Sequence, residues 1–367
     1  MRHSSRLRVL FAVTVTAAAA TYLYACSSSD PAPAIDDTPE TGTPDPPNPD
    51  PPKPPADGGG GGDDAGDLDA TAPKTCTVNP IIDGGAPREI ARGQFLDGPH
   101  WVDALGGLVM SEFNTATIVR VGPDGGALTN VRAPFGNGQP IGNSALKDYL
   151  VTAAVQPSRL ILTALPDAGD GGRVPILPDG GQAPNDLVIS SSGNMYVTDP
   201  AYQAANPQRT SVLRVSPTGV TSLVQSFIAA GPLPLPRPNG IALSPDEKTL
   251  YVSITEPKRI IAYPVNADGS TGAGKDLVAA ADLDLAPDGL AVDVGGNIYV
   301  AEAVAQGGGN PNRGVIEVFK PDGKKWGAIP IAGQRPTGLA FGADNKTLYV
   351  TTERNLLVLS VACEGIR

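Results

Sequence analysis

Histidine and cysteine are scarce in this 367-residue chain, and their scarcity excludes several kinds of active site. There are two histidines, His3 and His100, and three cysteines, Cys26, Cys76 and Cys363. A histidine-rich zinc site and a tetra-cysteine metal site therefore have too few ligands. No HExxH or GxSxG motif is present either. Any catalysis must depend mainly on carboxylates, amides and a hard cation.

Aromatic residues make up only 5% of the chain, whereas it contains 44 glycines and 38 prolines. This composition disfavours a helical bundle and indicates short strands joined by many turns. The formal net charge is -11. An excess of acidic residues argues against a nucleic acid partner, because the phosphate backbone attracts basic surfaces.

The first 25 residues have the pattern of an export signal. Three arginines within the first eight residues precede an apolar stretch over 9–21, which is short for a membrane span. The sequence Leu-Tyr-Ala-Cys at 23–26 resembles a bacterial lipoprotein cleavage box, in which Cys26 becomes the lipidated first residue. A plain secretory signal or a short anchor is the alternative. We expect an exported lipoprotein, anchored to a membrane of the cell envelope on its periplasmic or cell-surface face.

Residues 26–75 have the composition of a tether. Eleven of the 25 residues from 31 to 55 are proline, and five glycines follow at 58–62. Residues 27–75 carry 11 acidic side chains and two lysines, with little apolar surface to bury. Such a segment cannot form a core, so we expect it to be disordered.

Residues 76–367 contain six copies of a β-rich motif at intervals of 41 to 55 residues. A period near 45 residues with several strands per copy is typical of a β-propeller. We therefore predict an all-β, six-bladed propeller over 76–367. The copies occur at Gly107–Met110, Tyr149–Thr152, Met195–Thr198, Leu250–Ser253, Ile298–Ala301 and Leu348–Thr351.

The last copy ends short of a fourth strand, and a propeller must be closed. The segment after Cys76 is the natural donor of that strand. Closure of this kind brings Cys76 close to Cys363, and a disulfide between them is expected outside the cytoplasm. Two unpaired thiols are the alternative.

A second motif precedes the copies and supplies oxygen-bearing side chains in a shared register. Each is followed directly by an apolar strand, which we expect to be the innermost strand of its blade. The corresponding positions of the other two copies hold Gly142 and Thr337. Two carboxylates and two amides around one axis suit a hard divalent cation, Ca²⁺ above all; the alternative is that these residues only form turns. The four residues are Asp97, Asn185, Asn239 and Asp288.

These motifs resemble those of the gluconolactonase, regucalcin and luciferin-regenerating-enzyme family of six-bladed propellers. The resemblance covers about Phe95–Val361 and implies that Asp97, Asn239 and Asp288 hold the metal. It further implies that Asn185 binds metal or substrate and that Asp288 acts as general base. Two positions depart from the family pattern: Asp97 stands where Glu is usual, and Ala183 stands where some sugar lactonases have Arg.

The function expected from these residues is metal-dependent hydrolysis of a small-molecule lactone or related ester, by a monomer. The cation polarises the carbonyl group, with Zn²⁺, Mn²⁺ and Mg²⁺ as alternatives to Ca²⁺. We expect His100 and Tyr202 to contact the substrate together with Asn185. A non-catalytic propeller that binds a surface ligand is the alternative from another class, and a phosphotriesterase-like hydrolase on the same cation is a third.

Overall fold

The structure is a computed structural model that describes residues 76, 81–132, 138–155, 158–166, 181–204, 207–229, 233–303 and 313–367. The predicted signal, the lipidation site at Cys26 and the tether over 26–75 lie outside these residues. All described residues belong to the compact unit Leu68–Arg367. Their helices are three 3-10 turns: η1 (Asp103–Leu105), η2 (Phe113–Thr115) and η3 (Ala280–Asp282). None of the described helices has the length and apolar character needed to cross a membrane.

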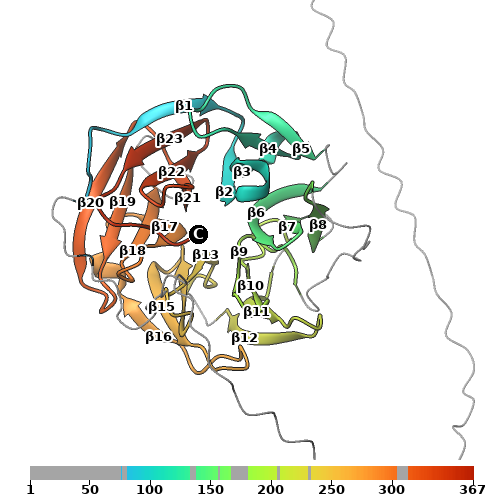
Figure 1. Ribbon diagram of the computed structural model, residues 1–367. Helices are drawn as coiled ribbons and strands as arrows, with labels where there is room; N and C mark the ends of the chain where they lie inside the picture. The colour runs from blue at the N-terminus through green and yellow to red at the C-terminus, as the bar shows by residue number, and fades with distance from the viewer. Residues whose placement is uncertain are drawn as a thin grey trace, which may run out of the picture. The chain divides into compact units, whose positions relative to one another are not determined.

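Six antiparallel sheets surround a central axis, which confirms the predicted six-bladed propeller (Figure 1). Blade 1 contains β2 (Leu96–Val102), β3 (Gly107–Glu112), β4 (Thr117–Val121) and β5 (Thr129–Arg132). Blade 2 contains, among the described residues, β6 (Gln139–Leu146), β7 (Tyr149–Val155) and β8 (Arg159–Ala164). Blade 3 contains β9 (Leu187–Ile189), β10 (Met195–Asp199), β11 (Arg209–Val215) and β12 (Thr221–Ile228).

The second half of the ring repeats this order. Blade 4 contains β13 (Pro238–Leu243), β14 (Thr249–Ile254), β15 (Arg259–Pro264) and β16 (Lys275–Val278). Blade 5 contains β17 (Ala286–Val292), β18 (Ile298–Ala303), β19 (Arg313–Phe319) and β20 (Lys325–Ala332). Blade 6 contains β21 (Pro336–Phe341), β22 (Thr347–Thr352), β23 (Asn355–Ser360) and β1 (Arg88–Arg92). The first strand of each blade in sequence, apart from β1, is the innermost, as predicted.

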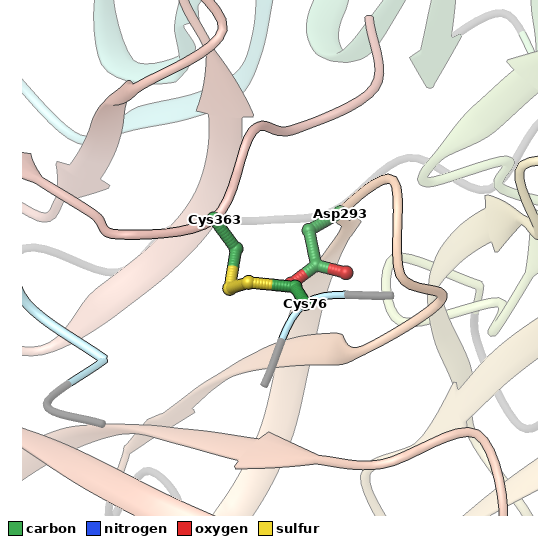
Figure 2. Close-up of side chains that lie close together, drawn as sticks. All are labelled: Cys76, Asp293 and Cys363. Carbon is green, nitrogen blue, oxygen red and sulfur yellow. A yellow bond between two sulfur atoms is a disulfide. The ribbon is translucent and has the colours of Figure 1, made fainter. Parts of the chain in front are cut away.

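Strand β1 closes the ring as the sequence predicted. It pairs antiparallel with β23, with Arg88 opposite Val358 and Arg92 opposite Asn355. Cys76 and Cys363 are joined as a disulfide next to Asp293, with their Cα atoms 5.7 Å apart (Figure 2). The N-terminal and C-terminal ends of the propeller therefore lie together, and the geometry suits the predicted pairing.

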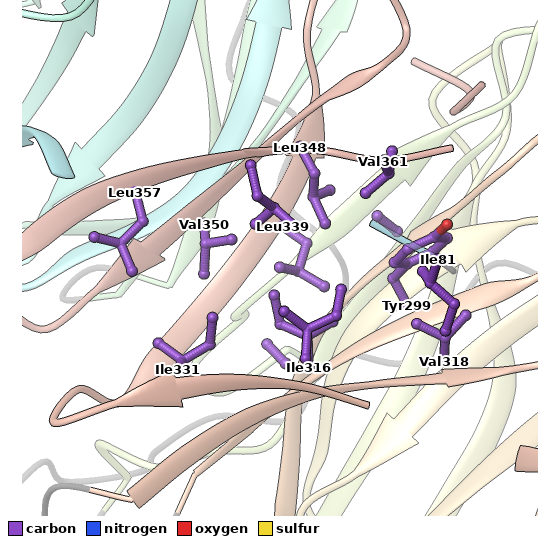
Figure 3. Close-up of a cluster of buried hydrophobic side chains, with 14 of the residues drawn as sticks. Ile81, Tyr299, Ile316, Val318, Ile331, Leu339, Leu348, Val350, Leu357 and Val361 are labelled. Atoms are coloured by element: carbon purple, nitrogen blue, oxygen red, sulfur yellow. The ribbon is translucent and has the colours of Figure 1, made fainter. Parts of the chain in front are cut away.

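The core lies between neighbouring blades. The second strand of each blade is almost fully buried, because its alternating side chains pack against the blades on either side. Figure 3 shows the cluster between blades 5 and 6, where Ile316 and Val318 meet Leu348 and Val350. Ile81, which precedes β1, packs into the same cluster. Closure of the ring thus buries apolar surface from both ends of the propeller.

Candidate functional site

A β-bulge lies at or next to three of the four predicted ligands, at the axial end of their blades. The pairing of the innermost strand with the second strand is interrupted at Asp97, at Asn239 and at Asp288. A bulge leaves its extra residues unpaired and turns their side chains away from the sheet. The same irregularity occurs in β6 and β21. The bulge therefore explains why the residues of one register share one site.

The bulge of β6 corrects the alignment of the second repeat. It lies between Pro140 and Asn143, so Ile141 holds the ligand position and Gly142 follows it. The alignment of the six repeats with one another had placed Gly142 at the ligand position. Ile141 has no oxygen in its side chain, so blade 2 contributes an apolar surface to the site.

The residue after the ligand position is glycine in five of the six blades. Neighbouring blades approach so closely here that a side chain does not fit. A Cβ atom on Gly240 would lie 2.7 Å from the Cα atom of Gly289, and one on Gly289 would lie 2.7 Å from that of Gly338. Real Cβ atoms essentially never approach another atom so closely. The glycines therefore allow the ligand positions to converge on the axis.

Asp186 is the exception in this ring of glycines. Its side chain fits because the neighbouring residue, Gly142, has no Cβ atom of its own. The Asp186 carboxylate accepts hydrogen bonds from the backbone amides of Leu187, at 2.8 Å, and Ile241, at 3.3 Å. It thus ties blade 3 to the inner strand of blade 4, and it adds a partly buried carboxylate that the predicted ligand set did not include.

Hydroxyl groups on the second strands fix the backbone of the next blade's ligand. Thr198 Oγ1 donates to the carbonyl oxygen of Asn239 at 2.5 Å. Ser253 Oγ donates to the carbonyl oxygen of Asp288 at 2.6 Å. Both hydroxyls are buried, so these bonds are shielded from water. Asn239 and Asp288 are therefore each held by the blade before them as well as by their own.

Two cavities meet at the ligand positions. One, which we call the entrance pocket, has a volume of about 540 Å³ and includes Tyr202 and Arg237 in its lining. The other, the axial channel, has a volume of about 270 Å³ and is lined by inner strands of all six blades. The residues shared by both linings are Asp97, Ile141, Asn185, Asn239, Asp288 and Thr337. The four predicted ligands thus form the boundary between pocket and channel.

The C-terminal residues lie across the channel on the side away from the entrance pocket. The amide of Ile366 donates to the carbonyl oxygen of Val292 at 2.9 Å, and Arg367 pairs with Asp103 at 2.6 Å. Ile366 and Arg367 both line the channel. The entrance pocket therefore offers the open approach to the ligand positions.

Two carboxylates at this boundary, Asp97 and Asp288, and the adjacent carboxylate of Asp186 in the axial channel are held in a low-dielectric environment. Burial raises the pKa of Asp97 to about 6. Burial, with a contribution from the charge of Asp97, raises the pKa of Asp186 to about 7. Burial and the charges of Asp97 and Asp186 raise the pKa of Asp288 well above its ordinary value. Within the described part of the chain, no lysine or arginine forms an ion pair with any of the three.

The donor set fits a hard divalent cation. Carboxylate and amide oxygens are the ligands that Ca²⁺ prefers, and a cation would offset the repulsion among the carboxylates. Asn239 is oriented for this role, because its Nδ2 donates to Thr255 Oγ1 at 3.1 Å. That bond turns the amide nitrogen toward Thr255 and leaves the Oδ1 atom for a cation.

The structure separates the two residues that were expected to contact substrate beside Asn185. Tyr202 lines the entrance pocket, 3.5 Å from Asn239 Nδ2, and is 41% exposed. His100 lies instead in the axial channel, beside Arg367. Burial and the charge of Arg367 lower the pKa of His100 to about 4, so its imidazole is neutral at pH 7. His100 does not reach the pocket that contains Tyr202.

Five of the six blades bring an oxygen-bearing side chain to one end of the innermost strand, and together they define a propeller with an axial site. The chain belongs to the SMP-30/Gluconolactonase/LRE-like family, whose model matches residues 95–354. The match runs from the start of blade 1 to the end of β22 in blade 6, and it confirms the resemblance that the motifs indicated.

Relatives with known names agree with this assignment. The chain is 30% identical to a gluconolactonase of Zymomonas mobilis over 312 residues, which cover 76% of this chain and 83% of the relative. It is 25% identical to a pentonolactonase of Haloferax volcanii over 50% of this chain and 61% of the relative. A calcium-binding regucalcin of Agrobacterium tumefaciens has the same fold, with a TM-score of 0.62, 19% identity and coverage of 77% of this chain and 95% of that one.

Proposed function

We propose that this protein is a metal-dependent hydrolase of lactones, with Asp97, Asn185, Asn239 and Asp288 holding one divalent cation. The observation that carries the proposal is the convergence of these four oxygen-bearing residues on the floor of an open pocket. The relatives named gluconolactonase and pentonolactonase support lactones as the substrate class. Calcium binding in the related regucalcin supports Ca²⁺ as the cation.

The cation, when bound, supplies polarisation of the lactone carbonyl and stabilises the negative charge that develops on its oxygen. Asp288 takes a proton from the attacking water as the water oxygen bonds to the carbonyl carbon. The ring C–O bond then breaks, and the proton passes to the departing alkoxide oxygen, so the product is the open hydroxy acid. Asn185 and the Tyr202 hydroxyl orient the substrate in the entrance pocket.

The aspartate that serves as base also belongs to the ligand set, and one variant separates the two roles. Asp288→Asn keeps the size and one oxygen but removes a charge and the proton acceptor. We expect it to lose at least about a hundredfold in turnover, the usual contribution of a general base, and only part of its metal affinity. Asp124→Asn makes the same change in an exposed turn between β4 and β5 and serves as the control.

The test combines a panel of lactones and esters with titration of Ca²⁺, Zn²⁺, Mn²⁺ and Mg²⁺ after treatment with EDTA. Activity that disappears with EDTA and returns with a cation supports the proposal. Asp97→Glu, which adds one methylene, should bind the cation as tightly as the wild type or more tightly. The proposed function is contradicted if Asp288→Asn hydrolyses lactones normally, or if the wild type binds no cation at millimolar concentration. Cation binding without turnover of any substrate favours the non-catalytic alternative.

We further propose that the protein is exported and anchored to a membrane through a lipid on Cys26. The basic and apolar N-terminal segment and the cleavage box support this proposal. The spacing of about 50 residues between Cys26 and Cys76 would let the propeller act at a distance from the membrane surface.

A further inference from the structure

Two sides of the entrance pocket are unlike, and blade 6 adds to its lining Arg335, which pairs with Glu353 at 2.9 Å. On the side of blades 3 and 4, its lining contains Tyr202, Gln203, Arg237 and Thr255, which offer hydroxyl, amide and guanidinium groups. On the side of blades 1 and 2, the described lining contains, besides Asp97, the side chains of Phe95, Phe113 and Ile141, which we call the apolar wall. Within the described residues, the three side chains of this wall offer no hydrogen-bonding group.

We infer that the pocket takes lactones that carry a hydrophobic substituent, which lies against the apolar wall while the lactone carbonyl lies at the ligand positions. The inference rests on the proposed lactonase function and narrows its substrate class. A polyhydroxylated lactone in the same position would turn hydroxyl groups toward a surface that cannot bind them, at a loss of their hydrogen bonds to water.

Phe95 is held in a backbone conformation that phenylalanine rarely adopts. Its φ is 59°, in the left-handed region, where a bulky side chain is strained. Two backbone bonds fix it there: its amide donates to the carbonyl oxygen of Glu353 at 2.8 Å, and its carbonyl oxygen accepts from the amide of Phe113 at 3.0 Å. Strain of this kind persists where the surroundings determine it, and it is common at ligand sites.

The same contacts bring the two aromatic rings together. The ring centroids of Phe95 and Phe113 lie 5.6 Å apart, with an angle of 50° between the planes. Both side chains remain partly exposed. Two aromatic rings that stay open to solvent next to the ligand positions provide apolar surface that a ligand can cover, and covering it is favourable.

The wall is supported from behind by an apolar cluster. Phe113 packs against Ile141, Val155 and Ala183, all of which are buried. Ala183, two residues before Asn185, is only 2% exposed and has no side chain that could reach a polar substituent. The polarity of the wall is therefore low throughout its depth, not only at its surface.

The experiment compares three six-membered lactones with the cation-loaded enzyme: δ-valerolactone, δ-decalactone and δ-gluconolactone. The first two differ only in a pentyl substituent. We expect kcat/KM for δ-decalactone to exceed that for δ-valerolactone by about tenfold or more, because each methylene placed in an apolar site adds selectivity. It should also exceed kcat/KM for δ-gluconolactone.

Two variants test whether the wall is the cause. Phe113→Ala removes one ring, and Phe95→Asn removes the other with a residue that tolerates the left-handed region. Both should lower the ratio of kcat/KM for δ-decalactone to that for δ-valerolactone toward one. Val220→Ala, which removes an apolar side chain that is 65% exposed outside the pocket, should leave the ratio unchanged.

Thermal unfolding confirms that each variant is folded before its kinetics are compared. A wild-type ratio near one, a preference for δ-gluconolactone, or a ratio that neither variant changes overturns the inference while the lactonase function stands. If the cation-loaded wild type hydrolyses none of the three lactones, the proposed function itself fails and the inference falls with it.

Discussion

Glu302 is a buried carboxyl group whose ionisation opposes folding. It lies on β18 and is fully buried, as is Glu317 on β19. Lys325 pairs with Glu317, while Glu302 accepts from the amide of Leu285 at 2.7 Å. Burial and a hydrogen bond with Glu317 raise the pKa of Glu302 to about 9. Glu302 is therefore protonated in the folded protein at neutral pH.

The raised pKa of Glu302 predicts a loss of stability in alkali. The pKa of Glu302 is higher in the folded protein than in the unfolded chain. The contribution of Glu302 to the free energy of unfolding is therefore complete below about pH 4.5, decreases as the pH rises, and is lost as the pH passes about 9. Glu302→Gln keeps the shape without the charge. We expect its Tm to exceed that of the wild type by several degrees at pH 8 and to match it near pH 4.5.

Thermal unfolding between pH 4.5 and 9 measures this difference. Glu89→Gln, in a more exposed position on β1, is the control and should follow the wild type at every pH. A Glu302→Gln variant that is less stable than the wild type at pH 8 would show that the ionised carboxylate is accommodated in the fold.

The sequence alone predicted the four ligand positions of the candidate site but not every residue around them. The shared register identified Asp97, Asn185, Asn239 and Asp288, and the structure brings all four to one boundary. It did not identify Asp186, although a signal existed: an aspartate stands where the other repeats have glycine. The prediction that His100 contacts the substrate depended on its closeness to Asp97 in the sequence. Gly98 and Pro99 lie between them in the bulge, and their side chains differ in direction: Asp97 lines the entrance pocket, whereas His100 does not.

At the scale of the strand, the structure depends on a pairing between the two ends of the propeller. β1 pairs with β23, and the bond between Cys76 and Cys363 spans 287 residues. A cross-link over so long a loop removes much of the conformational entropy of the unfolded chain. We therefore expect the disulfide to stabilise the closed ring.

Replacing both cysteines by serine tests the disulfide. The entropy of closing a loop of this length predicts a loss of about 5 kcal/mol in the free energy of unfolding, less any strain that the cross-link imposes. Denaturant unfolding measures the loss, and dithiothreitol should reproduce it in the wild type. If dithiothreitol changes the double variant as much as the wild type, or if peptide mapping finds both thiols free, the disulfide does not form.

The strands themselves were largely predictable, because the repeat fixes both their number and their order. The spacing of the copies predicted six blades, and the incomplete last copy predicted the closing strand. The bulges were not predictable, since a two-residue irregularity leaves no periodic trace in the sequence. This is why the second repeat was aligned on Gly142 instead of Ile141.

For the whole molecule, we expect the tether to separate attachment from catalysis. A shortened protein that begins at Ala72 should fold and hydrolyse lactones as the mature chain does, because residues 27–75 cannot build a core. Cys26→Ala in the full chain should release the protein from the membrane fraction without changing its activity. Cell fractionation and lactone assays on the two proteins measure both effects.

An inactive or insoluble shortened protein would assign the tether a part in folding or catalysis. A Cys26→Ala protein that stays with the membrane would indicate that the apolar segment over 9–21 remains as an anchor, which is the alternative given for the N-terminus.

The ring of glycines has a consequence for how such a site can change over time. In five of the six blades the ligand position lies at or next to a bulge of the innermost strand, and the backbone around it is set by the blades and not by that side chain. The site is therefore six exchangeable positions, of which four hold carboxylates or amides and two hold Ile141 and Thr337. A single codon change at any position alters the ligand set while the ring stays the same. A new specificity can thus arise by substitution alone, without insertion or rearrangement of a strand.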